Sequence, residues 1–280
     1  LGAPEDVRGA LLGLIDRALD DLLAALAGDA RRGARRALPT VSSGLDDTRQ
    51  LALQLIAQGG ACHHRLELIE RVTANAGLPG EVVGTGIDRP AAVPVDEVAP
   101  RLDLLGDYVV YVGRIEPEKG CAVMIDHFLR WQRETRATTT LALFGRSTMT
   151  FSENAHVRLM GVVPDGEKLA AIARARALVM PSRHESLSMV VLEAWMMDRP
   201  VLVNGDCEVL RGQVLRANGG LYYRRYEEFA AAMDLLLRQP ALASRLGRQG
   251  QAYFEANYAW DRVMEKYERL LARAAAPARP

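Results

Sequence analysis

From residue 106 onward, short apolar runs alternate with segments of helical pattern, and this alternation constrains the fold more than any other feature. Runs such as YVVYV, TLALF, ALVM and PVLV are separated by stretches in which apolar residues recur every three or four positions. Strands that alternate with helices form βαβ units, whose strands are parallel and covered by helices on both faces. The sequence therefore predicts an α/β fold with a Rossmann-like parallel sheet over about residues 106–224.

The residues before this sheet have a different pattern. A 3.6-residue apolar period over residues 4–30, and two further helical stretches before residue 78, predict a mostly helical N-terminal segment. Residues 81–88 have a short β-like pattern, and residues 89–100 are a proline-spaced linker. We expect four regions: 1–58, helical; 59–105, a transition and linker; 106–258, the sheet domain; and 259–280, a C-terminal helix and tail, with a helix break near residues 257–260.

Composition excludes several function classes. The chain of 280 residues has a formal net charge of +0, which gives no basic surface for nucleic acid. No apolar run is long enough to cross a membrane. The cysteines are Cys62, Cys121 and Cys207, without a C-x-x-C pair, which favours a reducing compartment over a disulfide framework or a zinc site. We expect a cytoplasmic protein without a signal peptide, and association with the inner membrane face stays open.

The turns that follow the predicted strands carry candidate ligand-binding residues. In open parallel sheets, ligands bind beyond the carboxyl ends of the strands. Gly113 lets the chain leave its strand tightly, and Arg114 and Lys119 lie before the next helix, where an arginine fork and a lysine charge suit a diphosphate. Gly145 offers close backbone approach after the next strand. Two solvated surface cations are the alternative interpretation of Arg114 and Lys119.

A second candidate site lies at the start of a later helix, in the segment HESLSMVVLEA. Either Ser186 or Ser188 suits the N-cap, and the backbone N–H groups of Leu187, Ser188 and Met189 would then form an anion site. The acidic residues of this segment, Glu185 and Glu193, are eight positions apart, about 12 Å along a helix. They would accept hydrogen bonds from sugar hydroxyls at the two ends of a diphosphate. An acidic first turn that complements the helix dipole is the alternative.

These segments resemble a known family. The G-R-x4-K-G element in VGRIEPEKG, the FGR turn and the E-x7-E element in HESLSMVVLEA are similar to the donor-binding C-terminal half of retaining glycosyltransferases of family 4, which have the GT-B fold. The resemblance covers about residues 81–272. It implies transfer of a sugar, of hexosyl type, from a nucleotide-diphosphate sugar with retention of anomeric configuration.

The resemblance also implies residue roles. Arg114 and Lys119 would hold the diphosphate, Glu185 would face the transferred sugar, and these three residues would be catalytic. Glu193 would bind the ribose, and the backbone of Val162 would meet the base. The other expected donor-binding residues are Gly113, Gly145, His184, Ser186, Leu187, Ser188 and Met189. No D-x-D pair occurs, which agrees with a family that uses no metal, and no cofactor other than the donor substrate is implied.

In the resembling family, an acceptor-binding domain precedes the donor half. Residues 59–105 look like a remnant of such a domain with its linker, whereas residues 1–58 do not resemble it. A partner domain or chain would then hold the acceptor (a sugar, lipid or protein), and the isolated chain is expected to transfer sugar poorly or not at all. A non-catalytic nucleotide-sugar-binding or scaffold module is the alternative. A GT-B epimerase and a redox Rossmann enzyme fit less well, because of the E-x7-E spacing and the absence of G-x-G-x-x-G after any predicted strand.

Overall fold

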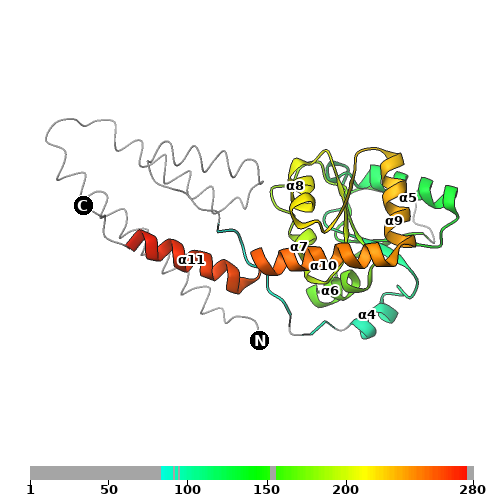
Figure 1. The fold of residues 1–280 in the computed structure, drawn as a ribbon. Coiled ribbons are helices and arrows are strands. Elements are labelled where there is room, and N and C mark those ends of the chain that lie inside the picture. The colour runs from blue at the N-terminus through cyan, green and yellow to red at the C-terminus, as the bar shows by residue number, and fades with distance from the viewer. Residues whose placement is uncertain (1–82, 91, 94, 152–155, 276–280) are drawn as a thin grey trace.

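The computed structural model describes residues 83–275 except 91, 94 and 152–155. The helices expected before residue 78 lie outside this range. The described residues form a six-stranded sheet flanked by helices, with a long C-terminal helix projecting away from it (Figure 1). The expected α/β fold with a Rossmann-like parallel sheet is therefore confirmed. No described helix has both the length and the apolar character needed to cross a membrane.

All strand pairings in the sheet are parallel, and the strand order is β3-β2-β1-β4-β5-β6. All five residues of the central strand β1 are buried, as apolar strands covered on both faces must be. The strands are β1 (Tyr108–Val112), β2 (Thr140–Phe144), β3 (Val157–Gly161), β4 (Leu178–Met180), β5 (Val201–Asn204) and β6 (Gly220–Tyr223).

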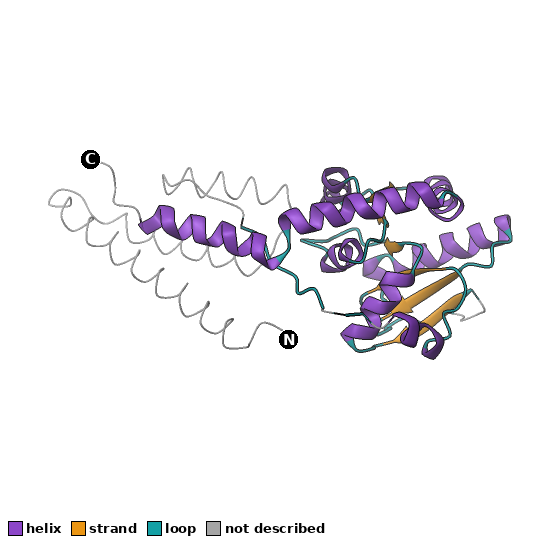
Figure 2. Ribbon diagram, turned by 60° about the horizontal axis from the view of Figure 1, so that its bottom comes forward, coloured by secondary structure: helices purple, strands orange, loops and turns teal. Residues whose placement is uncertain are grey.

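Helices cover both faces of the sheet (Figure 2). From β1 the chain moves outward to β3 and then returns to add β4, β5 and β6 on the other side, so right-handed crossovers place α5 on one face and α6, α7 and α8 on the opposite face. The helices are α4 (Val95–Arg101), the 3₁₀ turn η1 (Pro117–Lys119), α5 (Cys121–Thr135), α6 (Asp165–Arg174), α7 (Met189–Met196), α8 (Glu208–Ala217), α9 (Tyr226–Arg238), α10 (Pro240–Asn257) and α11 (Trp260–Ala275).

Two local expectations for the segment before the sheet are wrong. The β-like run that ends at residue 88 forms no strand over its described residues; Ile87 makes only an isolated bridge to Ala259. Gly86 packs flat on an indole there, since an added Cβ would lie 2.3 Å from the ring of Trp260. The proline-spaced linker contains helix α4, which has an acidic first turn and ends at Arg101, charges that complement a helix dipole. The expected helix break is confirmed between α10 and α11.

Candidate functional site

The candidate site lies where the direction of sheet growth reverses, between β1 and β4. Neighbouring crossovers leave these two strands toward opposite faces of the sheet, which opens a crevice beyond their carboxyl ends. The turn after β1 carries Arg114 and Lys119, and the turn after β4 carries Glu185. The structure therefore places Arg114 and Glu185 at the same edge of the sheet.

Three glycines form the backbone of this edge, each directly after or at the end of a strand. Gly113, Gly145 and Gly161 have φ values of +150°, +134° and +70°, which favour glycine. The N–H of Gly113 donates to the carbonyl of Phe144, and the N–H of Gly145 donates to that of Gly161. A Cβ on Gly145 would lie 2.0 Å from the carbonyl oxygen of Gly113. The glycines thus let the turns after β1, β2 and β3 pack directly on one another.

Hydrogen bonds from neighbouring side chains fix the turn that carries Arg114 and Lys119. The hydroxyl of Tyr111 donates to the carbonyl of Arg114 at 2.7 Å, and the thiol of Cys121 approaches the same oxygen at 3.8 Å. Burial raises the pKa of both Tyr111 and Cys121, so both remain protonated donors at neutral pH. The turn ends at Gly120, whose φ is +76° and where an added Cβ would lie 2.5 Å from the carbonyl oxygen of Pro181. The turns after β1 and β4 are therefore in direct contact.

Helix α7 begins at the same edge. Its N-cap is Ser188, which is 4% exposed and whose hydroxyl accepts from the N–H of Val191 at 3.4 Å. Of the two serines predicted as caps, Ser188 has this role, and Ser186 is an exposed residue of the preceding turn. Within the described residues, the N–H groups of Met189 and Val190 have no acceptor, as is usual for the first turn of a helix. These amides and the helix dipole favour an anion at this point.

A pocket of about 210 Å³ lies between the two turns and the start of α7. Most of the residues expected to bind the donor diphosphate and sugar line it. The lining residues are Tyr111, Val112, Gly113, Arg114, Lys119, Met180, Glu185, Leu187, Ser188, Met189 and Val190.

The charged side chains of the pocket are arranged in pairs. The Nζ of Lys119 donates to Oε1 of Glu185 at 2.8 Å, and both side chains are largely buried, with exposures of 26% and 15%. Arg114 lies 3.1 Å from Glu116, but its side chain is 70% exposed. Lys119 is therefore held by an ion pair in the lining of the pocket, and the exposed side chain of Arg114 can leave Glu116 to reach a ligand.

A second lysine holds the second glutamate. The Nζ of Lys168, on α6, donates to Oε1 of Glu193 at 2.9 Å and to Oδ1 of Asp165 at 3.0 Å. Burial acts to lower the pKa of Lys168, but the hydrogen bonds and charges of Glu193 and Asp165 outweigh it and raise that pKa. Sequence reasoning did not assign Lys168 to the site. Its one signal is that only three of the 35 basic residues of the chain are lysines, and two of these pair with the two glutamates of the E-x7-E element.

The remaining predicted residues do not line the pocket. Val162 follows β3 and is 77% exposed. His184 is exposed, and its carbonyl accepts from the hydroxyl of Ser182 at 3.1 Å. Gly145 supports the neighbouring turn, and Ser186 faces solvent. Among the residues that the structure describes, which leave out 91, 94 and 152–155 within the range 83–275, no group of three His, Cys, Asp or Glu side chains is placed to hold a metal ion.

Known proteins share this sequence pattern. Residues 106–239 match the family model described as "Glycosyl transferases group 1". D-inositol 3-phosphate glycosyltransferase of Frankia alni is 30% identical over 223 residues, which cover 71% of this chain and 54% of that protein. Glycogen synthase of Mycobacterium tuberculosis is 31% identical over 166 residues, which cover 55% of this chain and 40% of that protein. The chain thus spans about half the length of these curated relatives.

Solved structures share the fold. Sucrose-phosphate synthase from Thermosynechococcus elongatus superposes with a TM-score of 0.56 at 23% identity, over 74% of this chain and 57% of that chain. HepE from Anabaena, solved in complex with UDP and glucose, superposes with a TM-score of 0.58 at 16% identity, over 74% of this chain and 60% of that chain. The sheet domain of this chain is thus similar in sequence to glycosyltransferases of group 1, and it shares the fold of solved GT-B glycosyltransferases.

Proposed function

We propose that the chain carries the donor-binding half of a retaining glycosyltransferase that uses a nucleotide-diphosphate sugar. The observation that carries this proposal is the Lys119–Glu185 pair in the lining of a pocket that the start of α7 also lines. A lysine, an exposed arginine and free amides converge there, and each suits a diphosphate oxygen. Glu185 adds an acceptor for sugar hydroxyls. The solved complex of HepE with UDP and glucose supports a nucleotide sugar as the donor.

In this proposal, the leaving diphosphate is stabilised by Arg114, Lys119 and the first amides of α7. These groups are in place before the reaction, so they stabilise the charge that develops as the sugar–phosphate bond breaks. Glu185 orients the sugar, and the leaving diphosphate assists attack by the acceptor hydroxyl from the same face. We infer no metal and no cofactor, because cations and a helix dipole supply the neutralising charge.

The hypothesis of a non-catalytic binding module is less favoured, because the family model and the curated relatives are those of transferases. Which sugar is transferred, to which acceptor and in which compartment all remain proposals. A hexose donor, an acceptor held by a partner domain or chain, and a cytoplasmic location are the expectations we retain.

The test is a transfer assay with UDP-glucose and a panel of sugar, inositol and lipid acceptors, with product detected by mass spectrometry after long incubation. The anomeric configuration of any product is then read from its proton NMR coupling. Transfer is expected to be slow or undetectable with the isolated chain, and any product is expected to retain the α configuration. An inverted product would contradict the proposal, and UDP binding without any product, even when a partner domain or chain that holds the acceptor is supplied, would favour the binding module.

A further inference from the structure

Glu193 is held in an unusual way for a carboxylate in a helix. Its Oε1 accepts from Lys168, whereas its Oε2 is buried and has no hydrogen-bond partner among the described residues. A buried polar atom without a partner is costly and calls for an explanation. An oxygen of this kind is suited to accept a hydrogen bond from a donor group of a ligand that reaches it.

The position of Glu193 relates this oxygen to the pocket. Glu193 follows Met189 by four residues and Val190 by three, so its side chain neighbours each of theirs on the surface of α7. Met189 and Val190 line the pocket, and Glu193 is therefore one turn farther along the helix. A nucleoside attached to a diphosphate in the pocket is the part of the donor that would extend in this direction.

The choice of lysine at position 168 has a physical consequence. The chain uses arginine for all but three of its basic residues. An arginine fork pairs with both oxygens of a carboxylate, whereas a lysine is a point charge that engages one oxygen. In the structure, Lys168 contacts Oε1 of Glu193 and Oδ1 of Asp165, and it leaves the buried Oε2 of Glu193 without a hydrogen-bond partner. A lysine therefore keeps an acceptor available that an arginine would occupy.

We propose that Lys168 is the positioning residue for nucleoside recognition: it fixes one oxygen of Glu193 so that the other accepts a hydrogen bond from a ribose hydroxyl. The inference rests on the proposed function, since it requires a nucleotide in the pocket. It goes further by assigning a role to a side chain on α6 and by stating which oxygen of Glu193 contacts the ligand.

The test measures how strongly the protein distinguishes ribonucleotides from deoxyribonucleotides. Calorimetry on the full chain first determines which of UDP, GDP and ADP binds most tightly, and then compares that nucleotide with its 2′-deoxy and 3′-deoxy analogues. For the wild type, loss of the contacted hydroxyl is expected to weaken binding roughly tenfold or more, as for a hydrogen bond to a charged group.

Two substitutions distinguish a role of Lys168 in positioning Glu193 from a purely structural ion pair between the two residues. Lys168→Met removes the ammonium, and Lys168→Arg retains the charge but occupies both carboxylate oxygens. In both variants the ratio between ribonucleotide and deoxyribonucleotide affinities is expected to fall toward one. Lys168→Arg should keep the thermal stability of the wild type. A lowered affinity ratio in this variant is then not caused by misfolding. A merely structural ion pair would leave the ratio in Lys168→Arg unchanged.

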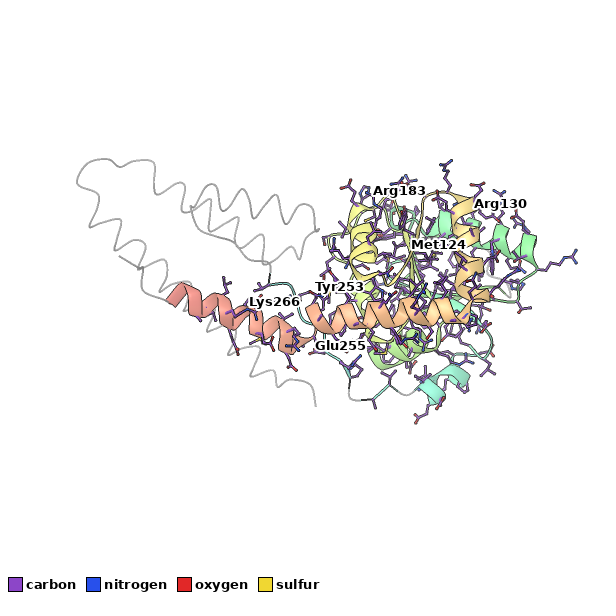
Figure 3. All side chains as sticks on the ribbon, in the orientation of Figure 1. Met124, Arg130, Arg183, Tyr253, Glu255 and Lys266 are labelled. Carbon is purple, nitrogen blue, oxygen red and sulfur yellow. The ribbon has the colours of Figure 1, made fainter. Side chains whose placement is uncertain are left out.

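The matched controls are Lys266→Met and Lys266→Arg. Lys266 lies on α11, away from the sheet domain (Figure 3), and its Nζ donates to the carbonyl of Asn257. These controls should leave the ratio at its wild-type value. A wild-type ratio near one, or an unchanged ratio in either Lys168 variant, would overturn the inference while nucleotide binding by the wild type still supports the proposed function. If the wild type binds none of the three nucleotides, the proposed function fails and the inference fails with it.

Discussion

At the residue scale, Glu185 and a bound diphosphate would compete for Lys119. The ammonium lies 2.8 Å from Oε1 of Glu185 in the free protein. When a phosphate oxygen approaches, this contact must be weakened or shared, and the carboxylate itself repels the anion. Glu185 therefore favours binding only when a sugar is present to donate hydrogen bonds to it.

This competition predicts the behaviour of Glu185→Gln. Free UDP should bind a few-fold more tightly, because removal of a partly buried charge pair releases Lys119 at a gain of about 1 kcal/mol. UDP-glucose should no longer bind more tightly than UDP, because the variant lacks the carboxylate that accepts hydrogen bonds from sugar hydroxyls. Calorimetric titration with both ligands measures the two effects. Weaker binding of free UDP would show that Glu185 does not compete for Lys119.

Ionisation of Tyr108 is expected to lower the free energy of unfolding at alkaline pH. Its hydroxyl donates to the carbonyl of Ala171, and burial raises its pKa to about 12. The same tyrosine in the unfolded chain loses its proton near pH 10. The contribution of the protonated Tyr108 hydroxyl to the free energy of unfolding is therefore fully present below pH 10 and is lost between about pH 10 and 12. The loss should reach about 1 kcal/mol near pH 11.

The measurement compares urea unfolding at pH 8 and pH 11. The wild type should lose more stability between the two pH values than Tyr108→Phe, which has no proton to lose at this position. Tyr222→Phe, which changes a tyrosine that is 43% exposed, is the control and should behave like the wild type. Equal losses in Tyr108→Phe and the wild type would contradict the assignment to Tyr108.

At the scale of elements, the edge of the sheet depends on close packing between consecutive turns. Gly145→Ala should destabilise the fold by about 1–3 kcal/mol or more, because it adds backbone strain and its Cβ would lie 2.0 Å from the carbonyl oxygen of Gly113. Gly166, in the first turn of α6, has no atom within 4 Å of an added Cβ. Gly166→Ala is thus the matched control, and it should leave stability unchanged or raise it by up to about 1 kcal/mol. Urea unfolding of both variants tests this, and equal effects would contradict the packing account.

Periodicity and turn chemistry predicted the sheet, its parallel strands and the turns that carry the pocket. Strands such as YVVYV are buried on both faces, so their apolar character is visible in the sequence. Helix α4 was missed, because its sequence VDEVAPR contains a proline and lies among other prolines. Local pattern alone therefore favoured a linker.

The ion pairs of the site could not be predicted in the same way. Lys119 and Glu185 are 66 residues apart, and Lys168 and Glu193 are 25 apart and on different helices. Only the packing of α6 on α7, and of the turn after β1 on the turn after β4, brings the partners together. The boundaries predicted at residues 58, 105 and 258 remain predictions.

At the scale of the whole molecule, binding and transfer make different demands. The groups proposed to hold the diphosphate all belong to one sheet domain, within residues 113–190. Transfer also requires an acceptor hydroxyl held near the anomeric carbon, and such positioning can supply several kcal/mol of the barrier. We therefore expect these 280 residues to bind a nucleotide diphosphate and to transfer sugar slowly or not at all.

Calorimetric titration of the full chain with UDP, with GDP and ADP in parallel, tests the central claim most directly. The account predicts that a nucleoside diphosphate binds, that binding weakens as salt is raised, and that it is lost in the double variant Arg114→Ala with Lys119→Ala. The double variant Arg130→Ala with Lys266→Ala, whose side chains lie away from the pocket, should bind like the wild type. Undiminished nucleotide binding in the Arg114 and Lys119 double variant would contradict the account.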